Sequence, residues 1–142
     1  MMARVNTRRV WLGAAAGWVA WCMWSAAFNT VILVPRYGAA VKEGALLAQP
    51  RYPFFVPVWF VALFLLALLG AWLYAGVRET RGAGPATALK IGAGLGFASG
   101  FPLAFLLAAW APFSRVLTLG WMLQLWVGAI VATLIAGWLY RD

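Results

Sequence analysis

The chain contains four long stretches without a charged residue, and this feature constrains its fold more than any other. The stretches are residues 10–35, 52–77, 91–114 and 116–140. Each is longer than the run of about 20 apolar residues that a helix needs to cross a bilayer. A closed barrel would require alternating polar and apolar residues, which these stretches lack. The sequence therefore predicts an all-α integral membrane protein whose four transmembrane helices form an antiparallel bundle.

Four spans are expected to form one transmembrane domain that covers residues 1–142. They are predicted at about residues 10–34, 54–77, 88–110 and 116–140, joined by short loops. Pro35 is expected to end the first span, since proline interrupts a helix. Residues 38–48 are rich in helix formers and are compatible with a short interfacial helix between the first two spans. An ordered loop without function is an equally good interpretation.

The charge pattern indicates a membrane partner and an orientation. The net charge is +8, and the basic residues are scattered at span ends without a compact patch, which favours anionic lipid headgroups over nucleic acid. The side that carries both termini has seven basic residues and the other has four. The seven are Arg4, Arg8, Arg9, Arg78, Arg81, Lys90 and Arg141; the four are Arg36, Lys42, Arg51 and Arg115. Basic residues accumulate on the cytoplasmic side, so we expect both termini in the cytoplasm and the chain in the bacterial inner membrane.

Small residues recur at every fourth position in the last two spans, which places them on one face of each helix. The third span carries Gly92, Gly96, Gly100, Ala104 and Ala108; the fourth carries Gly120, Gly128, Ala132 and Ala136, with Gln124 in the remaining place. Close backbone approach at small residues is a main source of helix association in lipid. We therefore expect the two stripes to pack against each other or against a partner.

Polar side chains inside the spans form the one candidate site. Asn29, Ser99 and Gln124 lie at similar expected depths, and Pro102 leaves the carbonyl of Ala98 without its helical hydrogen bond. Such a cluster could contact a lipid headgroup, a quinone or an ion. The alternative is interhelical hydrogen bonding, worth on the order of 1 kcal/mol per bond.

Four tryptophans lie deeper than the interfacial positions that this residue prefers. They are Trp18, Trp21, Trp24 and Trp126. A deep tryptophan face can bind a ring-bearing cofactor, a lipid tail or a neighbouring subunit; more often the indole N–H is satisfied across a helix interface. Phe97, Phe101 and Phe105 form another row with the same alternatives.

The residues that are missing shape the functional prediction. The chain has no histidine and no carboxylate within a span, which argues against histidine-ligated haem or zinc and against carboxylate-based proton antiport. We expect no catalytic residue, metal or cofactor, and no enzyme activity.

Residues 94–101 resemble the pore helix of small four-span fluoride channels, but the threonine–serine run of that family is absent. The leading hypothesis is a non-catalytic membrane subunit that packs in a larger complex, such as an energy-transducing one, with a role in assembly or stabilisation. The alternatives are a small homo-oligomeric channel or transporter, and a lipid- or quinone-binding protein.

Overall fold

The computed structural model describes residues 5–140, and this part of the chain contains helices and no strand. The elements are α1 (Thr7–Phe28), the π-helical turn η1 (Asn29–Leu33), α2 (Val34–Lys42), α3 (Phe55–Arg81), α4 (Pro85–Trp110) and α5 (Arg115–Leu139). Because α1, η1 and α2 are continuous, the described residues form four long helices, each long and apolar enough to cross a membrane. Arg4 and Arg141, which the orientation argument uses, lie outside the described residues.

The first helix continues past Pro35, so the prediction that it ends there is wrong. The π turn provides the physical reason. The Val34 N–H donates to the Asn29 carbonyl, five residues back, and Pro35 then sits in the first turn of α2, where its missing N–H is tolerated. The helix ends instead at Lys42, and Gly44 adopts a left-handed φ of 74° just beyond it. A separate interfacial helix over residues 38–48 is therefore also wrong.

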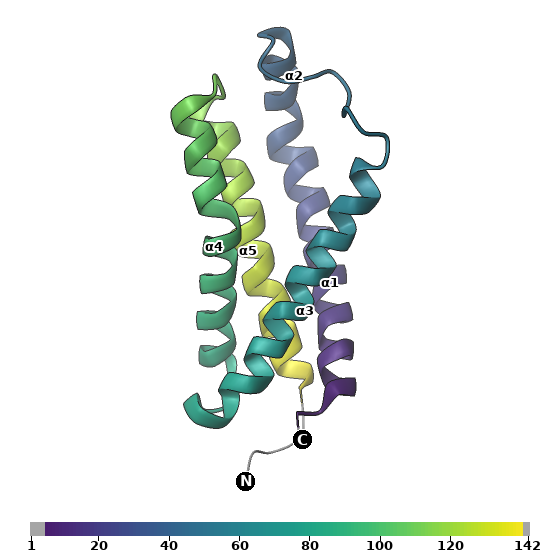
Figure 1. Cartoon of the computed structure of the whole chain (residues 1–142), viewed down its shortest axis with the longest axis vertical. Helices are drawn as coiled ribbons and strands as arrows, with labels where there is room; N and C mark the ends of the chain where they lie inside the picture. Colours follow the sequence, from purple (N-terminus) through teal and green to yellow (C-terminus); the bar gives the residue numbers. More distant parts are fainter. Residues whose placement is uncertain (1–4, 141–142) are drawn as a thin grey trace.

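The central helix of the bundle is α5, which packs against α1, α3 and α4. Figure 1 shows α3 crossing the bundle at an angle to the other helices. It contacts α1, α5 and α4. No contact joins α1 to α4 within the described residues. The start of α1 and the end of α5 lie at one end of the bundle (Figure 1), where the Asn6 amide donates to the Tyr140 hydroxyl at 2.9 Å. We call this the terminal end, and the opposite end, with the α4–α5 turn, the far end.

The two small-residue stripes do not face each other; each packs against a different helix. The α5 stripe faces α1, so that a Cβ added at Gly17 would lie 2.6 Å from the Ala132 carbonyl oxygen. The α4 stripe faces another side of α5, where a Cβ at Gly96 would lie 2.8 Å from the Trp126 Cα. Helix α5 thus uses one face for α1 and a second face for α4. The contacts of both stripes are made within the chain.

Candidate functional site

The Gln124 side chain lies buried between α5 and α1 and is 4% exposed. Its Nε2 donates to the hydroxyl oxygen of Ser25, which is also buried. The backbone carbonyl of Gln124 accepts a hydrogen bond from the Trp24 indole at 3.2 Å. Two consecutive residues of α1 therefore bind the side chain and the backbone of one residue of α5.

A second group of hydrogen bonds lies one turn further along the first helix, around η1. The Asn29 Nδ2 donates to the Ser25 carbonyl at 3.2 Å, and its Oδ1 accepts from the Tyr37 hydroxyl at 3.1 Å. The same hydroxyl accepts from the Trp121 indole at 2.8 Å. These bonds span the π turn and attach α2 to α5. Together with the Gln124–Ser25 bond they form a network, which we call the α1–α5 polar network.

The structure brings Gln124 and Asn29 together through Ser25, but it does not join Ser99 to them. The Ser99 hydroxyl donates to the Gly96 carbonyl of its own helix at 3.2 Å. Helix α4 packs against α5 on the side away from α1, so equal depth does not bring Ser99 to the network. Helix α4 also runs unbroken through Pro102.

Sequence reasoning missed Ser25 and Tyr37 as members of the network. The Ser25 position was recognisable, because it lies four residues before Asn29 on the same helical face. Tyr37 was not recognisable, since the first span was expected to end before it.

Three of the four deep tryptophans donate hydrogen bonds from their indole nitrogens across helix interfaces. Trp18 donates to the Phe60 carbonyl of α3 at 3.0 Å, and Trp126 donates to the Ala93 carbonyl of α4 at 3.0 Å. Trp24 bonds the α5 backbone, as described above. Trp21 is fully buried against Gly128, and its Nε1 has no hydrogen-bond partner among the described residues. All four rings therefore contribute to contacts between helices of this chain.

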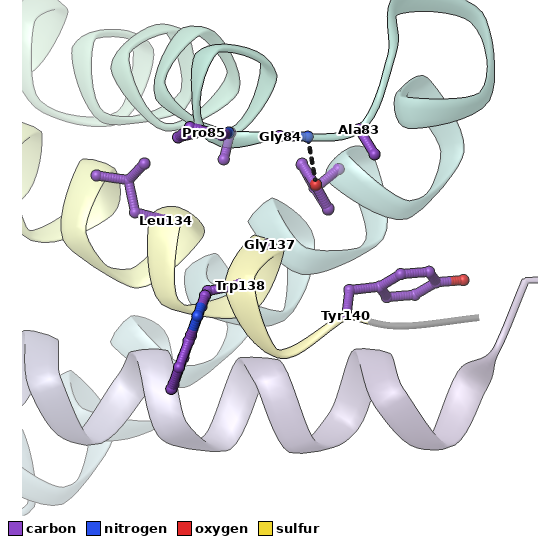
Figure 2. A pocket seen from close by; sticks show the side chains of 9 residues that line it. Ala83, Gly84, Pro85, Leu134, Gly137, Trp138 and Tyr140 are labelled. Atoms are coloured by element: carbon purple, nitrogen blue, oxygen red, sulfur yellow. Dashed lines mark hydrogen bonds between the residues drawn. The ribbon is translucent and has the colours of Figure 1, made fainter.

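A hollow of about 370 Å³ opens at the terminal end, between the α3–α4 turn and the last turns of α5. Figure 2 shows Gly84 of the turn and Pro85 of α4 on one side, Leu134 and Gly137 of α5 on the other, and Tyr140 at the edge. The dashed bond is donated by the Gly84 amide to the Tyr74 hydroxyl, at 3.0 Å (Figure 2). No charged side chain is among the described residues that line this hollow. It can accept an apolar group, but it provides little for polar recognition.

The fold and these contacts define an all-α chain of four long apolar helices in which the buried Gln124 amide and the half-buried Asn29 amide bond to other groups of the same chain. Within residues 5–140, no group of three or more histidine, cysteine, aspartate or glutamate side chains is placed to hold a metal ion. Comparison with known protein families, curated proteins and solved structures gave no match.

Proposed function

We propose that the chain is a non-catalytic integral membrane subunit that packs within a larger membrane protein complex and helps to assemble or stabilise it. The observation that supports this most is that the polar amides of the helices bond within the chain. Gln124 and Asn29 both bond within the α1–α5 polar network. A side chain that is held in this way stabilises helix packing. The interior then acts as a rigid scaffold, and interaction is left to the outward faces.

The outward face of α3 is the surface that we assign to a neighbouring subunit. Large apolar side chains recur on it at the three- and four-residue spacing that a packing helix face requires. They are Phe54, which directly precedes α3, and Val58, Val61, Leu65, Leu69 and Trp72 within it, all exposed. We call this set the outer α3 stripe. The opposite face of α3 uses Leu63, Ala67 and Gly70 for contacts within the chain.

The excess of basic residues at the terminal end supports placing both termini in the cytoplasm and the chain in the bacterial inner membrane. The same charges favour anionic lipids around the protein.

Site-specific photo-crosslinking in native membranes tests this proposal. A photoreactive residue is placed at Val58 on the outer α3 stripe, or at Val19 on the outward face of α1 as a matched control. The two valines are 56% and 52% exposed. We expect Val58 to yield one reproducible adduct with another integral membrane protein that also co-purifies in mild detergent at fixed stoichiometry, and Val19 to yield mainly lipid adducts.

Two results would overturn the proposal. One is purification of the chain solely as a monomer of 15.4 kDa or as its homodimer, with only lipid adducts at Val58. The other is ion or solute flux from liposomes that contain the purified chain alone, if the flux is lost in Gln124→Leu. That result would establish a channel or transporter instead.

A further inference from the structure

A groove runs along the α4–α5 seam toward the far end of the bundle. The two helices touch closely at Gly92 and Gly96, where an added Cβ would meet α5 backbone at 2.7 and 2.8 Å. A Cβ added at Gly100 would lie 3.3 Å from the nearest atoms of α5. Beyond it, Ala104 and Ala108 continue the small-residue stripe without filling the widening gap, and a hollow of about 230 Å³ remains.

The walls of this groove are apolar. Phe101 and Phe105 of α4 form one wall, with their rings stacked at 5.6 Å and 17°. Leu119 and Met122 of α5 form the other. The Thr118 hydroxyl also reaches the groove, but it already donates to carbonyls of its own helix, at 3.1 Å to Arg115. The walls therefore suit a hydrocarbon chain.

Arg115 is the charged member of the lining and stands at the far end of the groove, as the first residue of α5. Among residues 5–140 no ion pair or hydrogen bond engages its guanidinium group. The acidic residues of the whole chain are Glu43, Glu79 and Asp142, so the chain offers little negative charge to meet it. A basic side chain at the end of a spanning helix lies at headgroup level. The groove thus combines apolar walls with one uncompensated cation at the depth of lipid phosphates.

We propose that this groove binds one anionic phospholipid, with an acyl chain between the phenylalanine wall and α5 and the headgroup phosphate on Arg115. The planar guanidinium forms two parallel hydrogen bonds with phosphate oxygens, which makes arginine well suited to this ligand. The apolar walls match the acyl tail of an anionic lipid, and Arg115 at the far end of the groove matches its charged headgroup. The site rests on the membrane insertion that the proposed function includes, but it needs no partner subunit, because a free chain in the membrane and a subunit of a complex would both carry it.

Native mass spectrometry of the purified full chain tests this site. The protein is delipidated in detergent and given an equimolar mixture of phosphatidylglycerol and phosphatidylcholine with identical acyl chains. We expect wild type to retain one phosphatidylglycerol in preference to phosphatidylcholine. Arg115→Gln should lower this preference about tenfold, the factor that corresponds to about 1.4 kcal/mol.

Arg36→Gln is the matched control, because Arg36 is an exposed cation of α2 outside the groove; it should leave the preference unchanged. Ala108→Leu fills the groove and should reduce retention of both lipids. The proposal fails if wild type retains the two lipids equally, or if Arg115→Gln changes the preference no more than Arg36→Gln. If Arg115→Gln does not fold, Ala108→Leu decides instead: normal retention of both lipids by this variant would overturn the site.

Discussion

The indole ring of Trp21 lies directly over Gly128, and its nitrogen occupies the space that a side chain at position 128 would need. Trp21 is the largest fully buried side chain of the described residues, at 0% exposure. The pair therefore sets how closely α1 approaches α5. Close packing of a large ring on a glycine explains why a tryptophan can be accommodated here, since the contact gives dispersion energy.

Gly128→Ala should destabilise the protein by about 1–3 kcal/mol, the usual cost of adding volume to a packed core. The added methyl group would push the Trp21 ring and separate α1 from α5. Unfolding by increasing mole fractions of SDS in mixed micelles measures this cost. Gly94→Ala is the matched control, because a Cβ at Gly94 would meet nothing within 4 Å. Equal stability of the two variants would contradict the packing argument.

The Gln124–Ser25 hydrogen bond should appear as a coupling in a double-mutant cycle. Gln124→Leu and Ser25→Ala each remove one partner, and we expect a coupling of about 1 kcal/mol, as for other hydrogen bonds between membrane helices. Unfolding in SDS mixed micelles of both single variants and the double variant gives this value.

Ser99→Ala provides the control for this cycle. Ser99 bonds its own helix, so its effect should add to that of Gln124→Leu without coupling. A coupling between Ser99 and Gln124 as large as that between Ser25 and Gln124 would show that the α1–α5 polar network is assigned incorrectly.

The number of long helices followed from charge alone, because an apolar run of this length has few alternatives in any environment. The end of the first helix could not be predicted from the charge pattern. Proline predicts the end of a helix, but the π turn at Asn29–Leu33 shifts the hydrogen bonding so that Pro35 lies in the first turn of a new helical segment. The spacing of apolar residues along the chain does not reveal a change from α-helical to π-helical hydrogen bonding.

Sequence periodicity also identified which helix faces are smooth, but not which faces meet. The stripe that contains Gly120 and Gly128 faces α1, while the stripe that contains Gly96 faces α5. The order of helices around a bundle depends on three-dimensional packing, and depth along a span does not determine it. Ser99 was therefore grouped with Asn29 and Gln124 although its helix does not touch α1.

Tyr37→Phe should loosen α2 without unfolding the rest of the bundle. The variant removes the hydroxyl that accepts from Trp121 and donates to Asn29. An unpaired buried donor costs about 1–3 kcal/mol, and since the Trp121 indole is only partly buried we expect a cost of about 1 kcal/mol. Helix α2 has few other contacts with α5. We expect faster amide hydrogen exchange over residues 34–42 and unchanged exchange over residues 7–28.

The matched control for this variant is Tyr52→Phe, since Tyr52 is exposed in the loop before α3. It should leave exchange unchanged in both ranges. Uniform acceleration over both ranges in Tyr37→Phe would show that the hydroxyl supports the whole bundle and not the attachment of α2.

Gly84→Ala should destabilise the α3–α4 turn by about 1–3 kcal/mol, because Gly84 has a φ of 139° and a ψ of 177°, a region that is essentially restricted to glycine. Its amide also donates to the Tyr74 hydroxyl, so the strain would reach the terminal-end hollow. Gly38→Ala is the control: Gly38 lies in α2, has no positive φ, and an added Cβ there would meet nothing within 4 Å. Thermal unfolding in detergent, followed by circular dichroism, should show a lower midpoint for Gly84→Ala alone. If both variants unfold at the wild-type temperature, the turn tolerates a side chain and its geometry does not depend on glycine.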